Sequence, residues 1–488
     1  MKRVALKFAP WGPDQPALAE GHLTEAVGVI PAANGFRPLP SPMVMGGALP
    51  ERVTGAAAWA YDSEATGEPV LALAGTGGGI WQRFGKNWNR VKEAPGGLGW
   101  SFAVYGDNVL AVNGVDVPWL ATRADELDFQ PLADAPAARL VAVMGNFVVL
   151  GRLLENPAAV QWSAIDDPIS WPVPGSTEAQ IKQSDIQIFP DVGPVMALAT
   201  GMSGFDGLVF CGSGIFRMQY VGPPYIFQIS PVDKGRGALA AGAVVQAENV
   251  VYFLAEDGFF ATDGGVVLPI GAEVINNWWR QTADLKRRHE TLGVYDPVSG
   301  VVVWAFASSS ARAGQFDRLL LYHPQIKQFS TAEVSLEFLY LNSGLEVTLE
   351  DLDEFGPLDK LPFSLDAEGL INRVRLLSGF DGDHRPVIFS GPPQAARLTT
   401  EEKGGQRCFV HGVRPLVDGA EAQASMLYRD FQAGPYRVKA CGRASRLDGR
   451  HPIHLSTRYV RVRVDIPAGA EWHSALGAEL FVEEEGGL

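Results

Sequence analysis

The sequence predicts an all-β protein made of short antiparallel strands. Hydrophobic residues make up 47% of the 488 residues and charged residues 19%, which is typical of a folded globular chain. Glycine (55) and proline (34) are abundant without a G-X-Y period, and many short apolar runs lie between them. Apolar runs separated by turn residues indicate strands joined by tight turns.

A loosely repeated sequence pattern indicates which type of β fold the chain adopts. Each unit has a glycine- or asparagine-marked turn, an apolar strand, a second turn and a strand that contains an aromatic residue. The apolar strands begin near residues 70, 109, 147, 208, 250 and 301. A period of roughly 40–45 residues with about four strands per unit is typical of a β-propeller blade. We expect five to seven blades in residues 51–335, and residues 336–395 as an irregular segment or the last blade.

Three further segments lie outside these units. Residues 1–50 are rich in Pro, Gly and Ala and predict an extended N-terminal arm. Residues 272–290 carry apolar side chains at helical spacing and predict one amphipathic helix. Residues 396–488 predict a C-terminal platform domain, a β-sandwich or barrel. In that domain Val460, Val462 and Val464 alternate with Tyr459, Arg461 and Arg463, as expected for a half-buried strand.

The net charge of −15 is distributed unevenly along the chain. Between residues 429 and 463, nine Lys or Arg oppose two Asp, a net charge of +7, so the remainder carries −22. We call these nine residues the basic cluster. It is a solvated strand face, an interface that docks on an acidic surface of a neighbour, or a nucleic-acid surface. The cluster consists of Arg429, Arg437, Lys439, Arg443, Arg446, Arg450, Arg458, Arg461 and Arg463.

Two stretches have the composition of a binding motif but lack the residues that such a motif requires. The acidic run at 346–360 lacks the glycine and final glutamate of a calcium loop, and we expect a solvated loop there. The run "GTGGG" at 75–79 lacks the lysine and the following helix of a phosphate-binding loop, and we expect a blade turn.

A zinc site is one interpretation of the cysteines and histidines of the C-terminal domain. Cys408 and His411 form one short pair, and His451 and His454 form another, with Cys441 between them. Neither pair has the usual zinc spacing, so buried thiols and surface histidines are the simpler interpretation. No G-x-S-x-G elbow occurs in the sequence. We therefore expect no catalytic residues, no metal and no cofactor, and a non-enzymatic protein.

The remaining sequence features concern the compartment. The N-terminal segment is interrupted by Lys7 and Pro10 and does not have the form of a signal peptide. The longest apolar stretch, residues 140–151, is too short to span a bilayer as a helix. Three widely spaced cysteines suggest no disulfide framework. We expect synthesis in a reducing cytoplasm without membrane insertion.

Three stretches resemble the tail nozzle or hub proteins of short-tailed (podovirus-type) bacteriophages, the packaged-DNA stabilisation family. The first, "VQWSAIDDPISWPVP" at 160–174, has Trp162 and Trp171 at the positions of that family's tryptophans. The second, at 250–279, is similar to its D-G-F…D-G…I-G phrase and the aromatic-bearing helix that follows. The third is the series of arginine- and glycine-marked strands at 434–472.

The resemblance implies a structural protein of the virion tail. Such proteins form a homo-oligomeric ring, commonly of six copies, below the portal and its adaptor (connector) protein. The ring extends the channel, retains packaged DNA and conducts it during ejection. The implied partners are further copies of the chain, the adaptor, tail fibre or tail tip proteins, and double-stranded DNA that passes through the lumen without sequence-specific binding. The propellers project outward as attachment surfaces.

Two other functions stay open at this point. One is a propeller lectin or glycan-hydrolysing enzyme at a phage tail tip, which predicts carboxylates from several blades at the central funnel. The other is a cytoplasmic propeller scaffold, which predicts a monomer. Under the nozzle hypothesis the basic cluster lies at a subunit interface or in the channel. We favour the interface, because the remainder of the chain is acidic.

Overall fold

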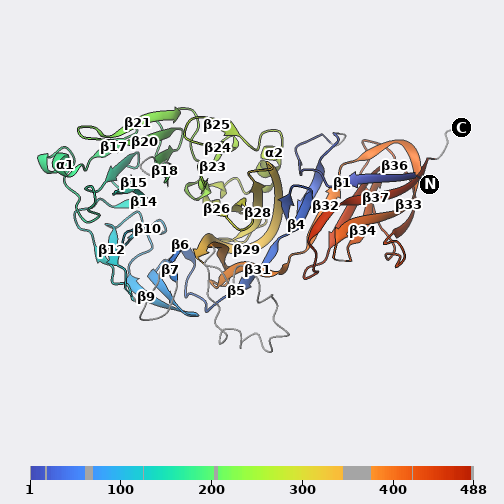
Figure 1. Cartoon of the computed structure of the whole chain (residues 1–488), viewed down its shortest axis with the longest axis horizontal. Coiled ribbons are helices and arrows are strands. Elements are labelled where there is room, and N and C mark those ends of the chain that lie inside the picture. Colours follow the sequence, from blue (N-terminus) through green and yellow to red (C-terminus); the bar gives the residue numbers. More distant parts are fainter. Residues whose placement is uncertain are drawn as a thin grey trace.

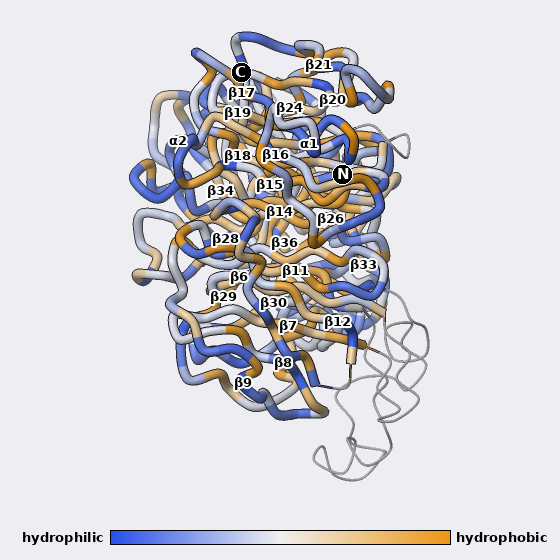
Figure 2. The backbone as a smooth tube through the Cα atoms, turned by 90° about the vertical axis from the view of Figure 1, so that its left-hand side faces the viewer, coloured by the Kyte–Doolittle hydropathy of each residue, from blue (hydrophilic) through white to orange (hydrophobic). Residues whose placement is uncertain are grey.

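The computed structural model shows an almost entirely β protein with two parts. A ring of small sheets lies on one side, and a curled sheet lies beside it on the other (Figure 1). Hydrophobic residues gather along the strands of the interior, and hydrophilic residues gather in the peripheral turns (Figure 2). This confirms the all-β propeller class. The described residues are 2–16, 19–60, 70–124, 126–202, 207–343, 375–419 and 421–484.

Five four-stranded antiparallel sheets follow one another along the chain and form blades 1 to 5. Blades 1 and 2 contain β6 (Val53–Ala60), β7 (Val70–Thr76), β8 (Gly79–Phe84), β9 (Asn87–Glu93), β10 (Ser101–Tyr105), β11 (Asn108–Val112), β12 (Trp119–Thr122) and β13 (Gln130–Pro131). Blade 3 contains β14 (Ala138–Met144), β15 (Phe147–Leu153), β16 (Ala159–Trp162) and β17 (Ile186–Ile188). Blades 4 and 5 contain β18 (Val195–Thr200), β19 (Gly207–Cys211), β20 (Ile215–Gly222), β21 (Ile226–Asp233), β22 (Val245–Ala247), β23 (Val250–Ala255), β24 (Gly258–Thr262) and β25 (Val267–Pro269).

Two further blades share one long strand. Blade 6 consists of β26 (Leu292–Asp296), β27 (Val301–Phe306), β28 (Phe316–His323) and the first half of β29 (Gln328–Ser343). From Leu336 onward β29 pairs instead with β30 (Arg375–Asp381). Next come β31 (Pro386–Pro393) and, as the outer strand, β5 (Pro40–Val44) from the N-terminal segment. The described residues therefore form seven blades, and residues 336–395 contribute to the last one.

The apolar runs of the sequence correspond to the second strand of each blade. All residues of β19 and β27 are buried, β7, β11 and β23 are buried at every position after the first, and β15 is buried at every position except Arg152. Face-to-face stacking explains this pattern, because each blade lies between two neighbours and both faces of its second strand are covered. The first strands of successive blades contact one another around the ring, and the short 3₁₀ helix η1 (Ala241–Ala243) lies beside β18.

The ring is closed where blade 7 meets blade 1. Tyr340 of β29 stacks on Phe380 of β30, and both pack with Val53 in one apolar cluster. The carboxylate of Glu337, 2% exposed, accepts a hydrogen bond from the backbone N–H of Val53 (3.0 Å) and contacts Nδ1 of His384 at 2.6 Å. Closure covers sheet edges and faces that would otherwise be exposed at the two ends of the series.

The platform domain is one curled antiparallel sheet. Its strand order is β35-β34-β36-β33-β37-β1, and β32 pairs with the C-terminal end of β36. Along β36 the valines at 460, 462 and 464 are buried and the residues between them are partly exposed, which confirms the predicted alternation. The strands are β1 (Lys2–Lys7), β32 (Ala396–Thr400), β33 (Lys403–Asp418), β34 (Gln423–Arg429), β35 (Arg437–Ala440), β36 (His451–Ile466) and β37 (Ser474–Glu484).

The N-terminal segment is extended, but it is not an arm separate from the domains. β1 belongs to the platform and β5 to blade 7, and the hairpin β3 (Val29–Ala32) and β4 (Gly35–Pro38) lies between them. β2 (Leu23–Val27) pairs with β32 of the platform and also meets β29 of blade 6 at Thr331. The segment forms strands because edge strands of both domains have backbone groups that need hydrogen-bond partners. The composition of residues 1–50 did not predict these pairings.

The predicted helix over 272–290 is much shorter in the structure. α2 spans Asn276–Thr282, because Ala283 leaves the helix and forms a β-bridge with Ser308. The carboxylate of Asp14 accepts hydrogen bonds from the backbone N–H groups of Asn277 (2.7 Å) and Trp278 (2.8 Å), so the arm caps this helix. The 3₁₀ helix η2 (Arg288–Glu290) lies at the end of the predicted range, whereas the short helix α1 (Thr177–Lys182) was not predicted. No helix in the described ranges is long and apolar enough to cross a membrane.

We predict that the ring seam depends on Glu337. Glu337→Ala leaves the Val53 N–H and His384 without their buried partner and should lower the free energy of unfolding by about 3 kcal/mol. The matched control on the same strand is Glu333→Ala, whose 68% exposed carboxylate pairs with Arg318 and should cost less than about 1 kcal/mol. Urea unfolding followed by tryptophan fluorescence measures both, and equal losses would contradict the prediction.

We also predict that the junction between the domains requires Gly28. Its φ is +72°, and a Cβ atom there would lie 2.1 Å from the carbonyl oxygen of Ala395. Gly21 also has a positive φ (+81°), but a Cβ atom there meets no atom within 4 Å. Gly21→Ala should therefore cost about 1 kcal/mol, whereas Gly28→Ala should cost at least about 3 kcal/mol. A similar loss of stability in both variants would show that backbone conformation alone, rather than close packing, matters at this position.

Candidate functional site in the basic cluster

The nine residues of the basic cluster lie on β34, β35, β36 and the loop between the last two strands. The platform sheet brings these strands together, because β34 pairs with β36 on one side and β35 on the other. The structure nevertheless separates the nine side chains into two groups. Five have partners inside the chain, and four do not have one among the described residues.

Arg429 and Arg461 belong to a closed network inside the platform. The Nε and Nη2 atoms of Arg429 donate to the carboxylate of Glu402, each at 2.7 Å. The hydroxyl of Tyr436 donates to the same carboxylate, which is fully buried. The guanidinium groups of Arg429 and Arg461 lie 4.5 and 4.3 Å from the centre of the Tyr436 ring. The buried carboxylate neutralises Arg429, and Arg461 lies against the face of the same aromatic ring, so both side chains have structural roles within the platform.

The pKa shifts in this network agree with that role. Burial alone would raise the pKa of Glu402, but hydrogen bonds from Arg429 and Tyr436 outweigh burial and hold it below its ordinary value. Burial, together with the hydrogen bond to Glu402, raises the pKa of Tyr436 to about 12. The phenol therefore remains a donor at neutral pH and the carboxylate remains an acceptor.

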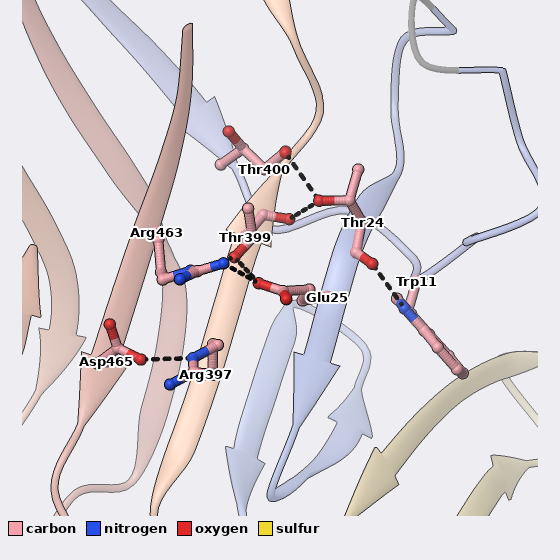
Figure 3. Close-up of polar contacts among 8 residues, drawn as sticks. All are labelled: Trp11, Thr24, Glu25, Arg397, Thr399, Thr400, Arg463 and Asp465. Carbon is pink, nitrogen blue, oxygen red and sulfur yellow. Dashed lines mark hydrogen bonds and ion pairs between the residues drawn. The ribbon is translucent and has the colours of Figure 1, made fainter. Parts of the chain in front are cut away.

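Arg463 holds the N-terminal segment to the platform. Its Nη2 atom lies 3.1 Å from a carboxylate oxygen of Glu25 on β2, and its Nε donates to the hydroxyl of Thr399 on β32 (Figure 3). On the same strand pair, Arg397 donates to Asp465 at 2.8 Å. These contacts lie between β2, β32 and β36, where the platform meets the strand that leads to the propeller.

The same junction has a second layer of hydrogen bonds. The Thr24 hydroxyl donates to the backbone carbonyls of Thr399 and Thr400, and the Trp11 indole donates to the carbonyl of Thr24 at 3.2 Å (Figure 3). Trp11 is buried and packs edge-to-face on Trp278 of α2. Arg463 therefore acts within the chain, as part of the link between the two domains.

Lys439 and Arg450 are held more loosely. The ammonium of Lys439 donates to the carbonyl of His454 at 2.6 Å. The guanidinium of Arg450 lies 5.3 Å from the centre of the Phe481 ring and 3.8 Å from the carboxylate of Asp448. Both side chains fix the loop that precedes β36 while they remain in contact with solvent.

Arg437, Arg443, Arg446 and Arg458 form the second group. All four are exposed, and none of their side chains has an ion pair or hydrogen-bond partner within the described part of the chain. We call residues 430–450 the basic hairpin. The sequence analysis missed that this hairpin also exposes large apolar side chains. They are Phe431 (75% exposed), Val438 (60%) and Leu447 (99%).

These apolar residues carried a weak signal in the sequence. Leu447 lies between Arg446 and Asp448 in a turn, and Val438 lies between Arg437 and Lys439. An apolar residue surrounded by charges is normally buried on the inner face of its strand, so exposure at both positions is informative. Basic and apolar groups together on one exposed hairpin have the composition of a docking surface.

The other predicted sites have simple structural roles where they are described. "GTGGG" forms the end of β7 and the turn to β8, as expected. His411 contacts Glu483 at 3.0 Å, His451 contacts the carbonyl of Gly442 at 2.9 Å, and burial raises the pKa of Cys441 to about 11. Three metal-ligating side chains do not converge anywhere in the described residues. The acidic run at 346–360 lies outside the described residues.

Comparisons with known proteins concern only the fold. No protein-family model matches the chain, and no curated protein matches it. Among solved structures, the chain is similar to the WD40 domain of Neurospora crassa Pan2 (TM-score 0.40, 7% identity, 72% of this chain and 96% of that one). It is also similar to BBS1N, solved in complex with ARL6DN (TM-score 0.41, 10% identity, 74% and 96%).

A third similar structure is an extracellular domain of a two-component system from B. thetaiotaomicron (TM-score 0.39, 10% identity). The match covers 83% of this chain and 48% of that one, so this chain spans about half of that domain's length. At these TM-scores the similarities carry no functional argument, and the fold assignment rests on the strand pairings described above.

We predict that Glu402 stabilises the platform in a pH-dependent way. Glu402→Gln removes the buried charge that Arg429 and Tyr436 bind and should cost about 2–3 kcal/mol of unfolding free energy at pH 7. Because the pKa of Glu402 lies below its ordinary value of 4.5 in the folded chain, this contribution is present above about pH 4.5 and is lost as the pH falls through the lower folded value.

The difference in stability between the wild type and Glu402→Gln should therefore narrow as the pH is lowered from 6 to 3.5. Urea unfolding at a series of pH values measures it. Glu471→Gln, an exposed change in the same domain, should show no such difference. If Glu402→Gln lowers the free energy of unfolding by the same amount at every pH, the charge of Glu402 does not stabilise the platform.

Proposed function

We propose that the protein is a structural component of a phage tail, a nozzle or hub subunit that assembles with copies of itself into a ring, of six in the family it resembles. The observation that carries the proposal is the basic hairpin, which exposes three large apolar side chains and three arginines, Arg437, Arg443 and Arg446, whose side chains have no partner among the described residues, on a chain whose remainder is acidic. The short phrases at 160–174, 250–279 and 434–472 support the same proposal by resemblance.

Charge makes another copy of the chain a fitting partner for the hairpin. Residues 51–395 contain 23 Lys or Arg and 40 Asp or Glu, a net charge of −17. The positively charged hairpin of one subunit is therefore attracted to the acidic propeller of the next subunit. Arg437, Arg443, Arg446 and Arg458 guide and orient that encounter, and the apolar residues Phe431, Val438 and Leu447 provide area to bury.

A ring of such subunits suits the passage of DNA. Each phosphate that binds a lysine or arginine adds affinity, so a strongly basic lumen would hold the duplex and oppose ejection. An acidic subunit repeated around a channel repels the duplex from the wall and lets it slide. The arginines that are bound inside each subunit, such as Arg429 and Arg463, add no phosphate contacts.

The alternative proposal is a propeller lectin or glycan-hydrolysing enzyme at a tail tip. A hydrolase of that kind needs two carboxylates at the funnel. Of the described inner strands, only β26 and β29 carry one, Asp296 and Glu337, and both lie in hydrogen-bonded, largely buried positions. The structural role is therefore the better-supported proposal, and an assay for hydrolysis of bacterial surface polysaccharide tests the alternative directly.

We predict that the purified chain forms a closed ring, alone or on a portal–adaptor complex, with a mass that is a whole multiple of its 52.5 kDa. Native mass spectrometry or light scattering measures this mass. Arg443→Glu/Arg446→Glu should weaken assembly at least tenfold, because it reverses two exposed charges of the hairpin. Lys234→Glu/Lys286→Glu, the same change of charge at exposed propeller positions, should not. A chain that stays monomeric and does not bind the adaptor would exclude the proposed function.

A further inference from the structure

Blade 3 has an unusually long connection between its third and fourth strands, β16 and β17. It spans residues 163–185 and includes the helix α1. We call these residues the blade 3 insertion. The corresponding connections of blades 1, 2, 4, 5 and 6 have two to seven residues and are residues 85–86, 123–129, 223–225, 263–266 and 324–327. A long connection in a compact domain commonly serves binding rather than the fold.

Buried tryptophans give the insertion a defined structure. The indole of Trp171 donates to the carbonyl of Pro168, and the indole of Trp162 donates to the carbonyl of Gln183, each at 3.0 Å. Both rings are buried. The hydroxyl of Ser176 caps the first turn of α1. Because these contacts fix the backbone, the insertion presents its surface side chains to a partner with little further loss of conformational entropy.

The insertion exposes large apolar side chains on this fixed backbone. Ile169, Val173 and Ile181 are 59%, 75% and 76% exposed, and β17, which follows, adds the exposed Ile188. Single exposed apolar residues are ordinary on a protein surface, but several on one short segment indicate a surface that binds another macromolecule. The basic hairpin exposes three large apolar side chains in the same way.

The charge of the insertion is opposite to that of the basic hairpin. The insertion contains four Asp or Glu and one Lys, a net charge of −3, and residues 430–450 contain five Lys or Arg and two Asp, a net charge of +3. Asp166 accepts a hydrogen bond from the side-chain amide of Asn146, and Asp185 accepts one from the backbone N–H of Ile186. Neither donor carries a charge, so these two carboxylates can still attract a cation of a partner.

The two surfaces lie at opposite ends of the molecule. α1 lies at the end of the propeller that is farthest from the platform, whereas β34 and β36, which flank the basic hairpin, lie in the platform at the other end (Figure 1). The hairpin therefore cannot reach the insertion of its own chain. A contact between them joins two copies through different surfaces, and repetition of such a contact gives a ring when the rotation between copies closes.

We propose that the basic hairpin of one copy docks on the blade 3 insertion of a neighbouring copy. The inference rests on the self-assembly in the proposed function, and it names the surface that receives the hairpin. Arg437, Arg443 and Arg446 face the acidic side chains of the insertion and orient the contact. The exposed apolar side chains of the two surfaces are buried against one another and supply affinity.

Removal of apolar side chains tests the contact without a change of charge. Val173→Ser/Ile181→Ser should raise the dissociation constant of self-association at least about tenfold, because these side chains lose the apolar area that docking buries. The matched control, Val266→Ser/Leu268→Ser, removes two similarly exposed apolar side chains from blade 5 and should leave the constant unchanged. Sedimentation velocity measures both, on the chain alone or on the portal–adaptor complex, and equal effects would overturn the inference.

A charge exchange tests the same contact on the full chain. The insertion variant is Glu178→Lys/Asp185→Lys, and the hairpin variant is Arg443→Glu/Arg446→Glu. Each alone should weaken self-association at least about tenfold, and the variant with all four changes should recover most of it, because the charges are then exchanged between the two surfaces.

A mixture of the two variants shows whether each of them is folded and able to dock. When the insertion variant and the hairpin variant alternate, every contact between them pairs opposite charges. An equimolar mixture should therefore assemble, with the two chains in equal numbers, whereas each variant alone assembles poorly. Native mass spectrometry measures this composition. A mixture that assembles no better than its components would overturn the inference.

The outcomes separate failure of the inference from failure of the proposed function. If the hairpin variant weakens the ring but neither change in the insertion does, the ring stands and the hairpin docks elsewhere. If the changes in the insertion abolish binding to the adaptor and leave self-association intact, the insertion binds the adaptor and the inference is wrong. If the wild type forms open chains of copies that both insertion changes disrupt, the docking stands and the closed ring is excluded. A wild type that remains monomeric overturns both.

Discussion

The architecture depends on how the propeller ring is closed. A propeller is stable only when its last blade covers its first, because every blade uses its neighbours to bury both faces. Here the last blade is assembled from two distant parts of the chain: β29 passes from the outer edge of blade 6 to the inner edge of blade 7, and β5 arrives from the N-terminal side. The seam contains a buried carboxylate, Glu337, whose two partners lie on different blades. Closure thus fixes the position of the N-terminal segment, and this segment fixes the platform.

The platform gains its orientation from the same segment. β2 pairs with β32 of the platform while it meets β29 of the propeller, and Glu25 on β2 binds Arg463 on β36. A single five-residue strand therefore belongs to both domains. This explains why the basic cluster, so uniform in the sequence, is not one site: part of its charge is used to hold the chain together, and only the remainder faces solvent.

The sequence was sufficient to predict the blades but not their closure. Strands such as β19 and β27 are apolar throughout, so their period was visible without any structure. The strands β2 and β5 are short, contain polar residues or proline, and pair with strands more than 300 residues away, so no local pattern marks them. For the same reason, the sequence predicts the charges of the candidate site but not the partners of its side chains. The charge of Arg429 is evident in the sequence, but its neutralisation by Glu402 is not.

The first and last strands of the described chain pair with each other in the platform sheet, β1 beside β37. The propeller is thus, in topology, an insertion between two pieces of the platform (Figure 1). During synthesis every blade strand precedes β37, so the platform sheet cannot be completed before the propeller strands have been made. A chain that is still being translated therefore has no finished platform sheet. The order of the strands delays completion of the platform until every strand of the propeller has been synthesised.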